Sequence, residues 1–138
     1  MAFDVKQDIR DRDLEKDGAW MDWDEETRFL VARKTSPRYK AAFSKGYREN
    51  ERLLSSKTNT KRADDIAEDL MLNCMAEHLL LGWEGVTDGG KDLPYSVEAA
   101  RFIIEEHDDL RSAIDEFSET RANFIAEADA RDAENLEK

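Results

Sequence analysis

A helical period of apolar residues between positions 61 and 81 constrains this sequence more than any other feature. Side chains recur there at spacings of three and four: Ile66, Leu70, Met71, Cys74, Met75, His78 and Leu79. This spacing places them on one face of an α-helix, which must be buried against other elements. The sequence therefore predicts an amphipathic helix that begins near Lys61 and ends near Gly82.

Three more segments show the same period. Ser36 followed by Pro37 is typical of a helix start, because the hydroxyl caps free N–H groups and proline has no N–H to lose. Ser96 marks a second such start, and Glu98 favours the positive end of that helix dipole. The three predicted helices span residues 37–56, 97–104 and 110–128.

The segment after Gly18 has strand character instead. A run around Trp20–Trp23 and a second run, Phe29–Arg33, flank the acidic tip Asp24–Glu26, which predicts a β-hairpin. We therefore expect an α+β fold, mainly α, with about four helices packed on an N-terminal β-hairpin. Residues 18–128 form the single domain, residues 1–17 a mobile charged arm and residues 129–138 an acidic tail.

Composition limits the class of protein. At 138 residues the chain suits one domain with a modest core, and its longest apolar run, Leu79–Leu81, is far shorter than a membrane span. Its start lacks the pattern of a signal peptide, so we expect it in the cytoplasm. The single cysteine, Cys74, excludes an internal disulfide.

Charge is distributed unevenly. The chain carries 33 acidic and 21 basic side chains, but residues 33–62 contain ten basic side chains and only two acidic ones, Glu49 and Glu51. The sequence is thus a charge dipole, which favours partners of complementary charge or contacts between copies. The basic helix 37–56 also permits an alternative function, a small nucleic-acid-binding or packaging accessory protein.

No motif predicts an enzyme. Cys74 and His78 lie one helical turn apart, but two ligands do not make a zinc site, and their spacing equally fits an apolar helix face. The paired carboxylates, such as Asp64–Asp65 and Asp108–Asp109, fit exposed helix ends without any catalytic role. We expect no catalytic residues, no metal and no cofactor. An acidic inhibitor that mimics DNA remains open.

The loop 83–95 contains large apolar side chains among glycines. Trp83, Val86, Leu93 and Tyr95 are costly to leave in water, so they pack the loop on the core, form a contact surface, or do both. These four residues are the candidate protein-binding site, with Phe29 and Tyr39 as secondary candidates.

The order of these features resembles the tail assembly chaperones of long-tailed, siphovirus-type bacteriophages, over about residues 18–128. The residues that carry the resemblance are Phe29-Leu30-Val31-Ala32-Arg33, Pro37, Tyr39, Trp83-Glu84-Gly85-Val86, Leu93-Pro94-Tyr95-Ser96, Asp109-Leu110 and Asn123-Phe124.

The resemblance implies a protein that binds the long, helical, apolar-rich tape measure protein and keeps it soluble until the tail tube polymerises around it. Further expected partners are the tail tube protein, a longer frameshifted form of the chain, and other copies that form a homo-oligomer. The resemblance places the chain in the host cytoplasm and outside the mature virion. It implies no membrane partner, and nucleic acid only under the alternative above.

Overall fold

The computed structural model describes residues 2–126, so the predicted acidic tail at 129–138 lies outside the described residues. Its strands are β1 (Ala19–Asp22), β2 (Arg28–Val31), β3 (Leu80–Glu84), β4 (Thr87–Asp88) and β5 (Lys91–Asp92). Its α-helices are α1 (Arg12–Asp17), α2 (Pro37–Glu49), α3 (Glu51–Leu54), α4 (Thr60–Cys74), α5 (Val97–Glu106) and α6 (Asp108–Glu119). A π-helix η1 (Met75–Leu79) and a 3-10 helix η2 (Arg121–Phe124) complete it.

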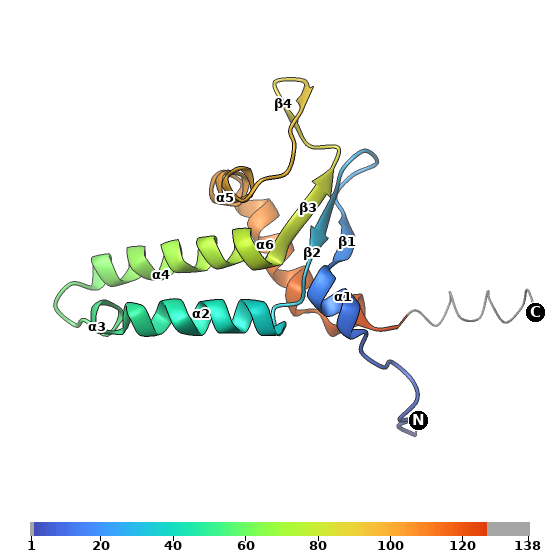
Figure 1. The fold of residues 1–138 in the computed structure, drawn as a ribbon, viewed down its shortest axis with the longest axis horizontal. Helices are drawn as coiled ribbons and strands as arrows, with labels where there is room; N and C mark the ends of the chain where they lie inside the picture. Colours follow the sequence, from blue (N-terminus) through green and yellow to red (C-terminus); the bar gives the residue numbers. More distant parts are fainter. Residues whose placement is uncertain (1, 127–138) are drawn as a thin grey trace, which may run out of the picture.

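The predicted α+β, mainly helical class is confirmed (Figure 1). Strands β1 and β2 form the expected antiparallel hairpin, with Met21 opposite Phe29. No Asn-Gly pair closes its turn. Instead the carboxylate of Asp24 accepts hydrogen bonds from the backbone N–H groups of Glu26 and Thr27, at 2.8 and 2.7 Å. Such an Asx turn reverses the chain direction without the glycine of a two-residue hairpin turn.

Strand β3 is the one element of the three-stranded sheet that the sequence analysis missed. It pairs antiparallel with β2 in the order β1-β2-β3, with a bulge between Leu30 and Val31. The apolar run at residues 79–81 lacks the apolar–polar alternation of a half-buried strand, so the sequence pattern indicates the end of a helix. In the structure the helix widens into η1 at Met75 and the chain then leaves it as a strand.

Helices α2, α3 and α4 form a hairpin that projects from the sheet, and we call residues 37–74 the helical arm (Figure 1). The predicted helix 37–56 is interrupted at Asn50, whose side-chain amide donates to the carbonyl of Gly46 at 2.8 Å. Helices α2 and α4 pack closely at Gly46, where an added Cβ would lie 2.2 Å from Leu70 Cδ1. The arm is therefore a preformed pair of helices.

The core lies where the inner face of the sheet meets η1, α5 and α6. Its fully buried side chains include Val31, Leu80, Ile104 and Ile114. The predicted fourth helix is shorter than expected, because α6 ends at Glu119 and the chain continues as η2.

The segment after β2 is bonded to three elements from distant parts of the sequence. Successive backbone N–H groups of Ala32, Arg33 and Lys34 donate to the carbonyls of Leu79 in η1, Glu15 in α1 and Ser118 in α6, at 2.8–2.9 Å. We call residues 32–34 the junction. It connects the sheet, both ends of the described chain and the base of the helical arm.

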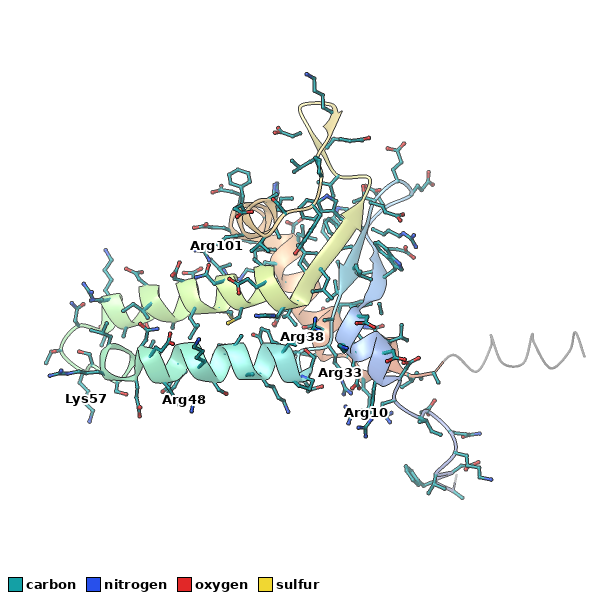
Figure 2. All side chains as sticks on the ribbon, in the orientation of Figure 1. Arg10, Arg33, Arg38, Arg48, Lys57 and Arg101 are labelled. Carbon is teal, nitrogen blue, oxygen red and sulfur yellow. The ribbon has the colours of Figure 1, made fainter. Side chains whose placement is uncertain are left out.

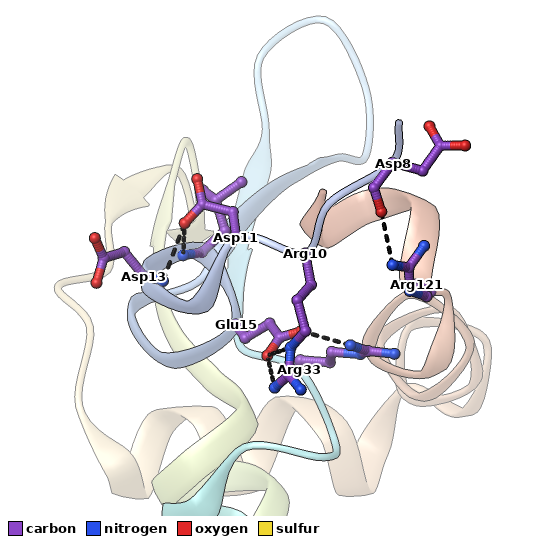
Figure 3. A network of polar contacts seen from close by, with 8 residues as sticks. Asp8, Arg10, Asp11, Asp13, Glu15, Arg33 and Arg121 are labelled. Atoms are coloured by element: carbon purple, nitrogen blue, oxygen red, sulfur yellow. Dashed lines mark hydrogen bonds and ion pairs between the residues drawn. The ribbon is translucent and has the colours of Figure 1, made fainter. Parts of the chain in front are cut away.

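Helix α1 belongs to this packed body, although the sequence analysis assigned residues 1–17 to a mobile arm. Its Glu15 is 4% exposed and pairs with Arg10 and Arg33 (Figure 3). Burial opposes ionisation of this carboxyl, but hydrogen bonds from the two arginines outweigh that effect and lower its pKa. The pairing could not be predicted from the alternating charges of residues 1–17, because sequence spacing does not show which carboxylate contacts a distant arginine.

Replacing this carboxylate should destabilise the fold in a pH-dependent way. Glu15→Gln keeps the shape but leaves two arginines without their anion, so we expect a loss of about 3 kcal/mol at pH 7. Because the pKa of Glu15 is lower in the folded protein than in the unfolded chain, its ionised form stabilises the fold fully at pH values above the ordinary pKa of 4.5. This contribution to stability is lost as the pH falls through the folded-state pKa. Urea unfolding from pH 7 to pH 3 measures both.

Glu105 is exposed and makes no ion pair with any other residue in the range 2–126, so Glu105→Gln is the matched control. Its unfolding curve should follow the unmodified protein within about 0.5 kcal/mol. Equal stabilities of the two variants at pH 7 would contradict a stabilising role for the Glu15 pairs.

Candidate protein-binding surfaces

The structure brings the four loop candidates together. Trp83, Val86, Leu93 and Tyr95 line a hollow of about 320 Å³ at the base of the β4–β5 hairpin, and each remains partly exposed. We call this the loop hollow. Its complete lining is Trp83, Glu84, Gly85, Val86, Asp92, Leu93, Pro94 and Tyr95.

The two secondary candidates do not join them. Phe29 is 3% exposed on the inner face of β2, and Tyr39 is 6% exposed at the base of the arm. Both rings contribute to the core. Phe29 reaches the loop hollow only indirectly, through an edge-to-face contact with Trp83 at a centroid distance of 6.4 Å.

The polar atoms of the loop aromatics are bonded internally. Trp83 Nε1 donates to the carbonyl of Leu93 at 2.8 Å, and the hydroxyl of Tyr95 donates to the carbonyl of Leu80 at 2.6 Å. The same hydroxyl lies 3.2 Å from the carbonyl of Ala76, in the π-helix. Burial raises the pKa of Tyr95, which keeps this donor protonated. The hydrogen bonds leave the apolar faces of the hollow available and hold them in place.

A glycine fixes where the loop meets the sheet. Gly85 has φ +79°, and a Cβ there would lie 1.9 Å from the carbonyl oxygen of Glu26. The hydroxyl of Thr27 donates to the carbonyl of Gly85 at 3.1 Å. The tip of the β1–β2 hairpin thus supports one side of the loop hollow.

A second surface lies on the helical arm. Tyr39, Phe43 and Tyr47 follow one another at spacings of four along α2, and we call them the aromatic row. Their exposure rises from 6% to 37% and 46% toward the far end of the arm. Tyr39 stacks on Phe43 with centroids 6.1 Å apart. The helical period places all three on one face of α2, but α4 packs against this helix at Gly46 and leaves Phe43 and Tyr47 partly in water.

The helical arm is basic along α2 and its tip. Residues 37–62 hold eight basic side chains and two acidic ones. Figure 2 shows Arg38 near the base, Arg48 along α2 and Lys57 at the far end. In the described part of the chain, Lys45 alone among the eight has a carboxylate partner, Glu49 at 4.0 Å.

The described residues contain no group of three or more His, Cys, Asp or Glu side chains placed to hold a metal ion. Cys74 is buried, and burial raises the pKa of its thiol. His78 lies 3.5 Å from the carboxylate of Glu77. Between residues 2 and 126, no helix has the length and apolar character needed to cross a membrane.

The sequence is similar to that of a known protein family. The sequence model of a family described as YdaY prophage protein matches residues 34–135, most of the chain. Searches of curated proteins and of solved structures return no match. The matched region includes the helical arm and the loop hollow.

Substitution of Gly85 should disturb the loop hollow. In Gly85→Ala, the methyl group meets the backbone of Glu26 in a left-handed conformation, so we expect a loss of about 3 kcal/mol. Gly89, at φ +59° with nothing within 4 Å, is the matched control, and Gly89→Ala should cost only about 1 kcal/mol. Urea unfolding followed by circular dichroism compares them, and equal costs would contradict the close contact at Gly85.

Proposed function

We propose that this chain, which belongs to the YdaY prophage protein family, is a tail assembly chaperone that binds the tape measure protein. Family membership makes it a phage-derived protein. The finer role rests on the resemblance of its sequence to tail assembly chaperones and on the surfaces described above. Under this proposal the chain acts by binding and has no catalytic role.

The loop hollow is the observation that carries the proposal. It is lined by two aromatic rings and by Val86 and Leu93, with a volume near the lower end of the range for binding pockets, about 300–1,000 Å³. Aromatic side chains in a prearranged pocket are typical anchors for a partner's apolar side chain. A long helical client with an apolar stripe would place such side chains in the hollow instead of against another client molecule.

Rigidity makes the hollow suitable for this work. The hydroxyl of Tyr95 and the indole of Trp83 are already bonded to backbone carbonyls, so binding would order few side chains. A preformed site loses less entropy on binding. The surrounding acidic chain, with a net charge of −12, would keep the complex in solution.

The proposal includes further partners. The tail tube protein and a longer frameshifted form would meet the chain during assembly, and further copies would bind along one client. The host cytoplasm is where this assembly would take place, before the mature virion forms. The opposite charges of the arm and the rest of the chain favour contacts between copies.

A second candidate function is supported by one observation. Within the described residues, the cations of α2 other than Lys45 have no carboxylate partner, and they lie on the same helix as the half-exposed Phe43 and Tyr47. Cations beside exposed aromatic rings are found in proteins that bind single-stranded nucleic acid. A nucleic-acid-binding accessory protein would show an affinity that falls steeply with salt. The chaperone remains our proposal because the residues outside the helical arm carry 27 acidic and 13 basic side chains.

Co-expression with the tape measure protein of the same phage tests the proposal. We expect this chain to keep the tape measure protein soluble and to co-elute with it in size-exclusion chromatography with light scattering. Val86→Glu puts a charge in the loop hollow and should reduce the co-eluting client about tenfold, or ~1.4 kcal/mol of binding. A tape measure protein that precipitates beside this chain would contradict the proposal.

Thr87→Glu is the matched control, because it adds the same charge one residue further on, at an exposed position of β4. It should leave co-elution unchanged. Thermal melts of both variants establish that each is folded. Equal loss of client in the two folded variants would mean that added charge alone, and not the hollow, affects binding.

A further inference from the structure

We infer that the helical arm is a docking surface for an acidic amphipathic helix of the client. The inference rests on the proposed function and deepens it, since it names the chemistry of the client segment and the second place where that segment binds. It is carried by the aromatic row, by the cations on the same helix, which apart from Lys45 have no carboxylate partner in the described residues, and by the fixed geometry of the arm.

The aromatic row extends the core onto the surface. Tyr39 lies in the core, Phe43 stacks on it, and Tyr47 continues the row where it is 46% exposed. Leu53, 39% exposed on α3, adds a further apolar side chain toward the tip. An apolar row that begins in a core and ends in water is suited to cover by a partner.

The shape of the row selects a helix as the partner. Side chains spaced by four on a 13-residue helix of about 20 Å form a ridge, and ridges of this kind pack into the grooves of another helix. The close contact of α2 with Leu70 at Gly46 keeps the ridge in position before a partner arrives. An amphipathic helix would therefore bind with its own apolar stripe on Phe43 and Tyr47.

The charges around the row select an acidic helix. Lys40 and Arg48 lie on α2 with the exposed aromatics, and Arg52 follows on α3. Among the described residues, the guanidinium of Arg48 makes a single long hydrogen bond, at 3.4 Å, to the carbonyl of Ser44. Carboxylates flanking the client's apolar stripe would neutralise these cations, whereas a basic helix would be repelled.

The same arm is less suited to nucleic acid. The exposed Asp64 and Asp65 lie on α4 of the arm, with no cation paired to them in the described residues. A long polyanion would meet these carboxylates and the acidic body as well as the cations. A short acidic helix could bind to α2 and α3 without approaching the carboxylates of α4, and it would carry fewer charges than a long polyanion.

Peptides from the tape measure protein of the same phage test the inference. A tiled set of fluorescent 30-residue peptides is titrated with the full chain at 50 and 200 mM salt. We expect the peptides that bind to carry carboxylates beside an apolar stripe, and to bind less tightly at the higher salt concentration. Tyr47→Ser and Arg48→Glu should each weaken that binding about tenfold.

Two controls match these variants in exposure and chemistry. Phe102→Ser removes a ring that is 63% exposed on α5, outside the arm, and Lys91→Glu reverses an exposed charge on β5. Both should leave peptide binding unchanged. Restored binding of Arg48→Glu to a peptide with lysine in place of its flanking glutamates would establish the charge contact directly.

The outcomes separate this inference from the proposed function. If the client stays soluble with this chain but neither arm variant weakens peptide binding, the arm inference is overturned and the chaperone proposal stands. If no peptide binds and the client precipitates, both fail. If the arm variants weaken binding of a 30-nucleotide single-stranded oligonucleotide while acidic peptides do not bind, the arm binds nucleic acid instead.

Discussion

The junction after β2 is the constraint on which the rest of the structure depends. Over residues 32–34, three successive backbone N–H groups bond to η1, α1 and α6, which come from distant parts of the sequence. Their side chains reinforce the pattern, because Arg33 pairs with Glu15 and Lys34 with Asp115 and Glu119. Three residues after Lys34, Pro37 begins α2, so the arm projects from the point where the sheet, α1 and α6 are held together.

Helical period and capping residues were sufficient to predict most of the fold. The starts of α2 and α5 at residues 37 and 97 were predicted from Ser36-Pro37 and from Ser96, whose hydroxyl accepts from Ala99 N–H. The expected cap by Ser36 was wrong, because its buried hydroxyl makes no side-chain hydrogen bond to α2, so the start of this helix depends on Pro37. The hairpin followed from β-rich runs about an acidic tip. Strand β3 could not be predicted, because its apolar residues continue those of the preceding helix and its pairing with β2 depends on tertiary contacts.

The candidate site was predicted in part. The glycine-rich loop signalled that Trp83, Val86, Leu93 and Tyr95 belong together, and they line one hollow. Phe29 is buried because alternation along β2 turns it inward. The exposure of Phe43 and Tyr47 could not be predicted, because a helical period shows that residues share a face but not where the opposing element lies. The nearby Gly46 was the available signal, since a glycine inside a helix often marks a close helix contact.

Hydrogen–deuterium exchange on the purified chain with and without the tape measure protein of the same phage tests the chaperone account most directly. The account predicts that amides of residues 83–87 and 92–95 and of α2 and α3 exchange more slowly in the complex, while amides of the exposed β4–β5 turn at residues 89–90 exchange at an unchanged rate and serve as an internal reference. Unchanged exchange over both surfaces in a mixture with excess soluble client, or protection confined to other parts of the chain, would contradict it.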